Sequence, residues 1–534
     1  MRWARTMAVG IAIALMTSMQ GTGLILARVS QQSNSLVVQT KQGRVEGVPA
    51  DGVVSFKGIP YVTPPVGDLR WREPKPAAAW DGVRKADAFG NTCLQPEVPG
   101  FETAVDKGVQ SEDCLYLNVF TAAVTTTTPL TDATATNAPK RPVMVWIHGG
   151  AYNIGSGSLA SYDGAPLVRQ GMVVVTFNYR LGQLGFFAHP ALEKDSPQGA
   201  VNFGLYDQIA ALQWVQKNIA AFGGDPNNVT IFGESAGGAA VLALFTSPLA
   251  KGLFHKGIAQ SYYGIPEATR AKAISLGTNV ASAVGLDGAN ATAEELRAVP
   301  AEQFKPFKGV KYSSAPVVTV GDSVMPQSIL SAFEKGQEAP LPLILGSVSN
   351  EGSVAVGFGI DVTALLRNLG AARIAARLLY LGERDDETLA LEVVRDLVYV
   401  APVLRLATLH SRRAPTWRYY FGYVPAGLTD TWKYGVSHGG EIAFAFNTLD
   451  MTPDFIGKMD DADRAMAVQV SGYWSAFAAT GVPASSAGPA WPQHTSRQDR
   501  LMNFGDTTAV QRNFSRTRLS IFATLYPRLL TPKS

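Results

Sequence analysis

The sequence is poor in charge and in cysteine, and beyond its first residues it lacks long apolar runs. Charged residues make up 17% of the 534, against about 25% in an average domain. The 46 basic and 43 acidic residues give a formal charge of +3, which is too balanced for the basic stripe of a nucleic-acid-binding protein. Apolar residues make up 46%, which excludes a disordered, fibrous or coiled-coil chain. The expected class is therefore a large compact body with little surface per residue.

The only apolar run of unusual length lies at the beginning of the chain. Arg2 and Arg5 precede the apolar residues 7–19, and the small residues 21–23 follow. This pattern predicts a secretory signal peptide over residues 1–23, with an end as late as residue 27. A retained membrane anchor is the alternative, because residues 7–27 are nearly long enough to span a bilayer. Polar residues dilute that run, so we expect an exported protein, periplasmic or secreted, with no stable membrane insertion after cleavage.

Cysteine occurs only twice, as Cys93 and Cys114. In an exported chain an even number of cysteines indicates a disulfide. This one would close a loop of about 20 residues and add roughly 3 kcal/mol of stability. Two free buried thiols are the alternative. No second pair of Cys or His residues stands at ligand spacing, so neither a metal site nor a cofactor is predicted.

Much of the chain alternates between strand-like and helix-like segments. Apolar runs predict strands at 115–120, 143–147, 173–177, 229–232 and 341–345, and helical periodicity appears at 206–218, from 237 onward, at 389–409 and at 466–480. The alternation predicts an α/β fold with a mostly parallel central sheet flanked by helices, in which sites lie at the carboxyl ends of strands. The low-complexity stretch 125–139 is interpreted as an exposed loop within a single domain that covers residues 24–534.

The sharpest local pattern is Gly-Glu-Ser-Ala-Gly at residues 233–237, which fits G-x-S-x-G. A predicted strand precedes it and a helix-forming run follows it, so the glycines allow the tight strand-to-helix turn that exposes a serine hydroxyl. The amino end of the helix also brings N–H groups near developing negative charge. Ser235 is therefore a candidate nucleophile. A capping serine in a glycine-rich turn is the alternative.

A serine nucleophile needs a base, and in this chain order the base is a histidine that follows the serine. Of the four histidines after Ser235, His438 is favoured because glycines flank it in the segment 435–441 (GVSHGGE). His255 and His494 are less favoured, and His410 is expected on a solvated helix face beside two arginines. His438 and Glu441 could instead share a metal, but two ligands without a third are weak support.

The group that orients the base should stand just past a strand end. Glu351 follows the predicted strand 341–345, Asp322 follows the apolar residues 317–320, and the local pattern leaves both open. An oxyanion stabiliser should come from a glycine turn after an earlier strand, and residues 148–151 (HGGA) supply one. Their N–H groups would meet that of Ala236, the residue after the nucleophile. No Gly-Lys-Ser/Thr follows, so this turn is not a phosphate-binding loop.

Longer stretches carry a family resemblance: SEDCLYLNV at 111–119, NYRLG at 178–182 and the block from 202 to 238. Together with the motifs above, they make the chain resemble the type-B carboxylesterases. This group includes para-nitrobenzyl esterases, animal carboxylesterases and cholinesterases. The resemblance covers about residues 36–505. It implies an α/β-hydrolase fold with helical insertions after the nucleophile helix.

The resemblance also implies roles for individual residues. It implies a catalytic triad of Ser235, Glu351 and His438, which decides the choice of acid against Asp322. The remaining implied residues are the oxyanion donors Gly150, Ala151 and Ala236, the buried polar groups Glu234 and Ser261 behind the nucleophile, and the disulfide between Cys93 and Cys114.

The sequence departs from the family pattern at two places near this site. Ala151 replaces the third glycine of the usual turn, a change that keeps the N–H group. Tyr262 replaces the glycine that usually follows Gln-Ser, and we expect it to crowd or polarise the wall of the cleft.

The implied activity is hydrolysis of carboxylic esters through an acyl-enzyme, with a small-molecule ester as substrate and with no cofactor, metal or nucleic-acid partner. One alternative is a catalytically silent binding or adhesion module on the same fold. Another is an amidase or carbamate hydrolase that uses the same triad. Because the chain holds 24 Phe, 17 Tyr and few charges, we expect uncharged, moderately apolar esters. The oligomeric state is left open.

Overall fold

The computed structural model describes residues 36–530, with gaps at 102, 104, 107, 124–138, 194–195, 197–198, 306–317, 369–371 and 381–384. The described residues fall in one compact unit. The predicted signal peptide and nearly all of the predicted low-complexity loop lie outside them. Within these described ranges, no helix is both long and apolar enough to cross a membrane.

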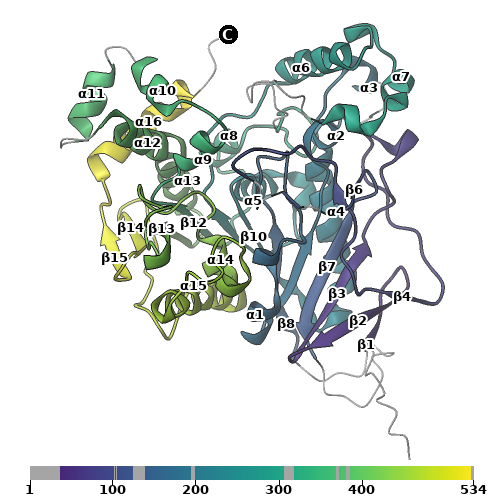
Figure 1. Ribbon diagram of the computed structural model, residues 1–534, viewed down its shortest axis with the longest axis horizontal. Helices are drawn as coiled ribbons and strands as arrows, with labels where there is room; N and C mark the ends of the chain where they lie inside the picture. Colours follow the sequence, from purple (N-terminus) through teal and green to yellow (C-terminus); the bar gives the residue numbers. More distant parts are fainter. Residues whose placement is uncertain are drawn as a thin grey trace, which may run out of the picture. The chain divides into compact units, whose positions relative to one another are not determined.

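A sheet of 13 strands runs through the unit in the order β1-β2-β3-β7-β9-β8-β10-β11-β12-β13-β14-β15, with β4 beside β2 (Figure 1). The central strands from β9 to β14 are parallel to one another, and antiparallel pairs flank them at both ends. The strands β5 and β6 form a separate pair. The strands are β1 Leu36–Gln39, β2 Arg44–Ala50, β3 Val53–Pro60, β4 Val83–Lys85, β5 Thr92–Cys93, β6 Gln110–Ser111, β7 Tyr116–Ala122, β8 Arg141–Ile147, β9 Val173–Phe177, β10 Gly224–Glu234, β11 Lys256–Gln260, β12 Leu343–Val348, β13 Thr416–Phe421, β14 Arg500–Phe504 and β15 Ala509–Arg512.

Helices lie on both faces of the sheet and beyond the carboxyl ends of its strands (Figure 1). They are α1 Ala165–Arg169, α2 Gly182–Gly185, α3 Pro190–Glu193, α4 Phe203–Asn218, α5 Ala236–Thr246, α6 Arg270–Ala283, α7 Ala293–Ala298, α8 Ile329–Glu334, α9 Ser353–Gly357, α10 Val362–Asn368, α11 Ala372–Leu379, α12 Asp386–Val394, α13 Ala401–His410, α14 Ile442–Phe446, α15 Asp461–Thr480 and α16 Arg516–Leu529.

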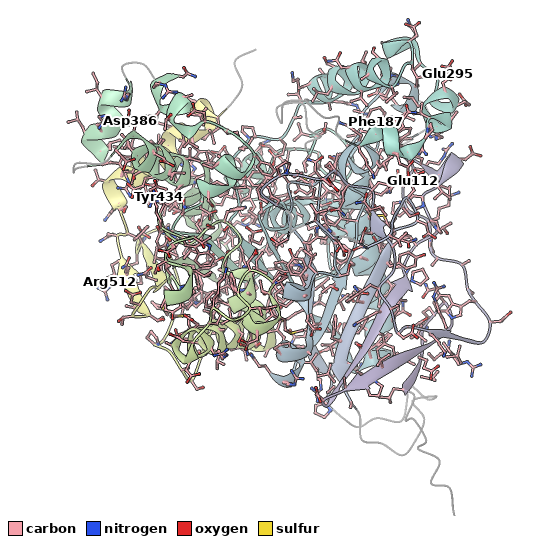
Figure 2. The ribbon with its side chains drawn as sticks, in the orientation of Figure 1. Glu112, Phe187, Glu295, Asp386, Tyr434 and Arg512 are labelled. Carbon is pink, nitrogen blue, oxygen red and sulfur yellow. A yellow bond between two sulfur atoms is a disulfide. The ribbon has the colours of Figure 1, made fainter. Side chains whose placement is uncertain are left out.

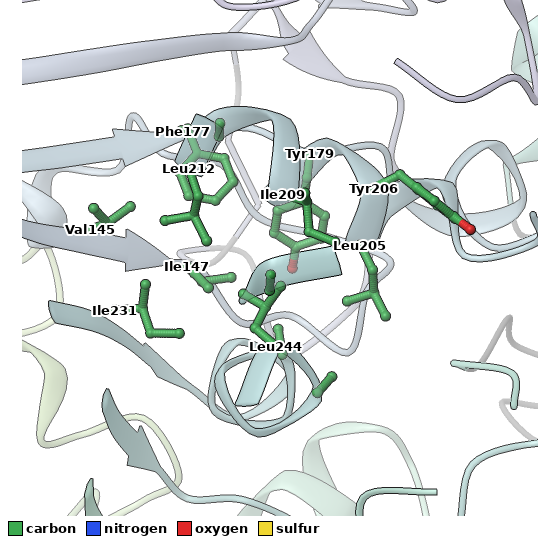
Figure 3. Close-up of a cluster of buried hydrophobic side chains, with 14 of the residues drawn as sticks. Val145, Ile147, Phe177, Tyr179, Leu205, Tyr206, Ile209, Leu212, Ile231 and Leu244 are labelled. Atoms are coloured by element: carbon green, nitrogen blue, oxygen red, sulfur yellow. The ribbon is translucent and has the colours of Figure 1, made fainter. Parts of the chain in front are cut away.

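The central strands are apolar at almost every position because both faces of the sheet are covered. Val145 and Ile147 of β8 point into the core that includes α4 and α5, whereas Met144 and Trp146 point into the core that includes α14 and α15. Figure 3 shows the first of these two cores, with Leu244 of α5 near Ile147. The buried strands therefore form a rigid base for whatever stands at their ends.

Four neighbouring parallel strands end side by side. In the register of the sheet, Ile147 of β8 pairs with Gly233 of β10, Glu234 of β10 pairs with Gln260 of β11, and Gln260 pairs with Gly346 of β12. The loops that follow these strands therefore start at one edge of the sheet. Ser235 stands at that edge directly after β10, and Glu351 stands there three residues after β12.

The predicted mostly parallel sheet with flanking helices is confirmed, and each predicted strand is present as β7, β8, β9, β10 or β12. The segment 389–409 differs from the single predicted helix. It lies in α12, a π-helical turn (Arg395–Val400) and α13, which follow one another without a break. The apolar spacing of this segment is helical throughout, so the sequence does not mark the change of hydrogen-bonding pattern.

The predicted disulfide between Cys93 and Cys114 is present. It joins the end of β5 to the residues just before β7, and both cysteines are buried. The covalent link therefore fastens the irregular segment between β5 and β7 to the start of a sheet strand.

Candidate active site

Ser235 stands at the sharp corner between β10 and α5. Its φ of 57° and ψ of −120° lie outside the regions that ordinary side chains adopt, so the corner stores backbone strain of the kind found at functional sites. Two backbone hydrogen bonds hold the corner: the Ser235 N–H donates to the Gln260 carbonyl at 3.0 Å, and the Ala239 N–H donates to the Ser235 carbonyl at 2.8 Å.

The glycines on both sides of Ser235 are required by close backbone approach. A Cβ on Gly233 would lie 2.6 Å from the carbonyl group of Gly237, and a Cβ on Gly237 would collide with the carbonyl oxygen of Ile147. The corner therefore packs directly against the end of β8. This contact explains in physical terms why the serine is flanked by glycine at these two positions.

The turn after β8 lies against the serine. A Cβ on Gly149 would lie 3.3 Å from the Cβ of Ser235, and Gly150 has a φ of 95°. Ala151 also has a positive φ, 52°, so it keeps the left-handed backbone of the glycine that it replaces. The turn after β8 is therefore within contact distance of the serine corner.

His148 anchors this turn from behind. Its ring stacks on Tyr179 with centroids 4.3 Å apart, the Tyr179 hydroxyl donates to the His148 carbonyl at 2.8 Å, and Nδ1 lies 2.9 Å from the Gly149 carbonyl oxygen. Burial lowers the pKa of His148 to about 4. The ring is therefore neutral at ordinary pH and adds no charge beside the turn.

Glu351 and His438 meet across the edge of the sheet. Nδ1 of His438 lies 2.5 Å from Oε2 of Glu351, while Oε1 of Glu351 accepts a hydrogen bond from the Val348 N–H at 2.8 Å. The His438 N–H donates to the Ser353 hydroxyl at 2.9 Å, and a bridge between Asn350 and the residue before His438 joins the two loops. The carboxylate is fully buried, so it fixes the orientation of the imidazole and leaves Nε2 without a hydrogen bond within the described residues.

Two further carboxyl groups lie near this imidazole. Oε1 of Glu234 is 3.1 Å from Nε2 of His438. Burial raises the pKa of Glu234 to about 8, against the opposing charge of His438. Burial alone would lower the pKa of His438, but the charges of Glu234 and Glu351 raise it to about 9. The two shifts describe one competition for a proton, because His438 loses its strongest anionic neighbour whenever Glu234 is protonated.

Glu441 completes the buried acidic group. Its Oε1 accepts from the Tyr419 hydroxyl at 3.2 Å and from the Ser261 hydroxyl at 3.3 Å, and burial raises its pKa to about 7. From the sequence alone, Glu441 was considered only as a possible metal ligand together with His438. The signal that could have placed it here is its position three residues after the histidine, in a loop that returns to the sheet edge.

The other sequence candidates lie apart from this group. Asp322 is buried and accepts hydrogen bonds from the Asn202 side chain at 2.9 Å and the Met325 N–H at 2.8 Å, so it stabilises a loop. His494 is buried, with its Nε2 3.2 Å from the Thr408 hydroxyl, and His255 lies just before β11.

The expectation for His410 was wrong, because its side chain is buried rather than solvated. Its Nδ1 lies 3.0 Å from Oε1 of Glu338, and its Nε2 lies 2.8 Å from the Leu341 carbonyl oxygen. The two neighbouring arginines follow the end of α13, whereas His410 is on the inner face of its last turn.

The site places a serine corner, a glycine turn and an imidazole oriented by a carboxylate at one edge of a parallel sheet. Comparisons with known proteins agree with this arrangement. The carboxylesterase family model matches residues 34–374 and 375–522. The chain belongs to the type-B carboxylesterase family.

This esterase is 34% identical to fumonisin B1 esterase from Sphingopyxis macrogoltabida, over 93% of its own length and 91% of that protein. It is 33% identical to para-nitrobenzyl esterase from Bacillus subtilis (strain 168), over 91% and 98% of the two chains. Among solved structures, a para-nitrobenzyl (PNB) esterase gives a TM-score of 0.75 at 31% identity, and a Geobacillus stearothermophilus carboxylesterase gives 0.78 at 30%. Each of these structures is covered completely and matches 91% of this esterase.

These matches show the α/β-hydrolase fold and the activity of a carboxylic-ester hydrolase with a small-molecule ester as substrate. The family resemblance read from the sequence is therefore confirmed.

Proposed function

We propose that this esterase hydrolyses carboxylic esters through an acyl-enzyme, with Ser235 as nucleophile, His438 as base and Glu351 as the group that orients the base. The observation that carries the proposal is the 2.5 Å contact between Glu351 and Nδ1 of His438, which orients the imidazole so that Nε2 lies beside Glu234, the residue before the strained serine. A serine nucleophile requires a base that a carboxylate orients in this way.

The reaction follows in two halves. Nε2 of His438 takes the proton of the Ser235 hydroxyl as Oγ attacks the ester carbonyl, and the N–H groups of Gly150, Ala151 and Ala236 bind the oxyanion. The carbonyl re-forms, the alcohol leaves with the proton from Nε2, and the acyl group stays on Oγ. Water then repeats the sequence through the same nitrogen and releases the acid.

The test is hydrolysis of short-chain para-nitrophenyl esters by wild type beside Ser235→Ala. We expect a loss of about 10³-fold or more in kcat for the variant. Organophosphate labelling of the wild type at Ser235 is the second readout. A variant that keeps its activity, or a label on another residue, would contradict the assignment.

We also propose that the protein is exported, to the periplasm or outside the cell. The buried disulfide Cys93–Cys114 supports this location because such bonds persist in oxidising compartments. Fractionation of the native host, with the mature amino terminus identified by mass spectrometry, tests the proposal. A full-length chain in the membrane fraction would favour the retained anchor instead.

For the substrate class, we propose uncharged, moderately apolar esters, in keeping with the low charge and high Phe and Tyr content of the chain. A strong preference for polyanionic esters would contradict this proposal.

A further inference from the structure

A group of tyrosines lies next to the imidazole of His438 and takes no part in the proton transfers described above. We call Tyr262, Tyr263 and Tyr399 the tyrosine wall. The ring of Tyr399 packs edge to face against the ring of His438, with centroids 5.3 Å apart and an interplanar angle of 60°. The ring of Tyr263 packs against that of Tyr399 at 6.5 Å and 75°. The wall therefore continues outward from the reacting group.

Tyr399 is presented to His438 by the π-helical turn Arg395–Val400. A π-turn holds one extra residue, which rotates the residues after it by roughly 100° about the helix axis, and such turns are frequent at functional sites. Without the extra residue, Tyr399 could not face His438 while the helix that follows it keeps its present orientation. The local departure from α-helix thus has a definite result, which is an aromatic ring against the catalytic imidazole.

Buried charges hold this turn in place. Asp396 is ion-paired with Arg395 at 2.7 Å and with Arg518 of α16 at 2.6 Å, and it accepts a hydrogen bond from the Tyr380 hydroxyl at 2.9 Å. The helix α16 packs against this turn and against α13, and in Figure 2 the labelled Asp386 marks the start of α12, which leads into the turn. With three partners, the carboxylate fixes the first two residues of the turn, so Tyr399 has little freedom to move away.

Tyr263 is tied to the same turn through the backbone. The N–H of Gly264 donates to the carbonyl of Val398 at 2.7 Å. Tyr262, at the family's glycine position, is buried and stacks on Tyr263 with centroids 6.2 Å apart and rings 12° from parallel. Tyr263 itself is only partly buried, so one part of the wall remains open.

The partly buried ring of Tyr263 lies one ring further from His438 than that of Tyr399. Burial raises the pKa of the Tyr152 phenol well above its ordinary value, and the nearby Tyr263 phenol is the next contributor. Tyr152 directly follows Ala151, a proposed oxyanion donor. Because Tyr399 packs against the ring of His438, an ester attacked by Ser235 beside that ring would carry one of its two groups toward Tyr399 and its neighbour Tyr263.

We propose that Tyr263 and Tyr399 are specificity-determining residues that make this esterase prefer esters with a phenyl-sized aromatic group close to the scissile carbonyl. The proposal rests on the proposed function of the same site. Aromatic rings attract one another in edge-to-face or offset contacts at 4.5–7 Å, with a gain of up to about tenfold for each contact beyond the effect of burial. The rings of the tyrosine wall are already spaced at such distances. The aromatic ring of a substrate would add a further contact of the same kind. A saturated ring of the same size would be buried equally well without this gain.

The test compares pairs of esters that differ only in aromaticity. Ethyl phenylacetate against ethyl cyclohexylacetate probes the acyl side, and benzyl acetate against cyclohexylmethyl acetate probes the alcohol side. We expect a kcat/KM ratio of about ten in favour of the aromatic member for one pair, falling several-fold in Tyr263→Leu and Tyr399→Leu, because leucine keeps an apolar contact but not the ring. Tyr263→Phe should keep the ratio.

Tyr116→Leu is the matched control, because Tyr116 begins β7 and its phenol lies beside Asp113. If Tyr399→Leu fails to fold, the partly exposed Tyr263 decides alone. A wild-type ratio near one in both pairs, or a ratio that Tyr263→Leu leaves unchanged, would overturn the proposal. An increase in activity on long aliphatic esters with an unchanged ratio would also overturn it, because the tyrosines would then only fill space. If the wild type hydrolyses no ester at all, the proposed function has failed instead.

Discussion

The carboxylate of Glu234 lies 3.1 Å from Nε2 of His438, and its removal in Glu234→Gln should change the pH at which the imidazole becomes neutral. A base must be neutral to accept the serine proton, so the acid limb of the kcat/KM profile reports its pKa. The negative charge of Glu234 stabilises the imidazolium and raises the pKa of His438. Without that charge the imidazole stays neutral to lower pH, and the acid limb moves to lower pH.

The size of the shift follows from the distance and from where the proton goes. Two unit charges 3.1 Å apart interact by about 5 kcal/mol at an effective dielectric constant of 20, which corresponds to at most about 4 pH units. Burial raises the pKa of Glu234 to about 8, so Glu234 takes the proton in part of the molecules and the imidazole there stays neutral. The substitution removes a charge that stabilises the imidazolium only in the fraction of molecules that carries the proton on His438. We therefore expect a downward shift of at least about one pH unit.

The assay is kcat/KM for a short-chain para-nitrophenyl ester from pH 4 to 10, for wild type, Glu234→Gln and Glu441→Gln. Glu441 is the matched control, because its charge contributes least among the three carboxylates to the raised pKa of His438. Its substitution should shift the limb less. An acid limb that does not move in Glu234→Gln would refute the reasoning, since the proton would then reside on Glu234 in wild type or the base would be another group.

Four further variants test the disulfide, a buried ion pair and the choice between the two candidate acids. Cys93→Ser should lower the free energy of unfolding by about 3 kcal/mol, and a reducing agent should destabilise wild type in chemical denaturation but not the variant. Arg180 and Asp207 form a buried ion pair at 2.7 Å, so Asp207→Asn should cost about 3–5 kcal/mol by the same assay, because it leaves a buried charge without its partner. Asp322→Asn should lower stability by about 1–3 kcal/mol and leave kcat of the folded protein nearly unchanged. Glu351→Gln, by contrast, should reduce kcat by about 10³–10⁴-fold, and an equal loss in Asp322→Asn would reverse the choice between the two acids.

The sequence predicted Ser235, Glu351 and the glycine turn because each follows a recognisable strand, and it predicted His438 because glycines flank it. The apolar segments at 143–147 and 229–232 end within two residues of the ends of β8 and β10. Neighbouring parallel strands bring such ends together at one edge of the sheet. Glu351 is the instructive case, since local pattern alone favoured it but still left Asp322 open. Only the tertiary structure shows that Asp322 accepts hydrogen bonds from Asn202 and Met325, whereas Glu351 reaches His438.

The features that sequence reasoning missed depend on contacts between distant segments. The π-turn that presents Tyr399 has the same apolar spacing as an α-helix, and its anchor at Arg518 is more than a hundred residues further along the chain. His410 was misjudged for a similar reason. Its neighbours along the chain are arginines, but its partners Glu338 and Leu341 belong to another segment.

The difference between backbone contacts and side-chain contacts explains why the reaction class could be predicted from the sequence and the substrate could not. At the serine corner, a Cβ on Gly233 or Gly237 would strike backbone atoms, and no change in neighbouring side chains can relieve such a clash. A site built on backbone contacts therefore needs nearly fixed residue types, and those types form a motif that can be recognised. The tyrosine wall meets the substrate only through side chains, which can be exchanged without moving the backbone. Substrate preference is therefore carried by residues such as Tyr263, whose importance appears only when the folded chain shows what it faces.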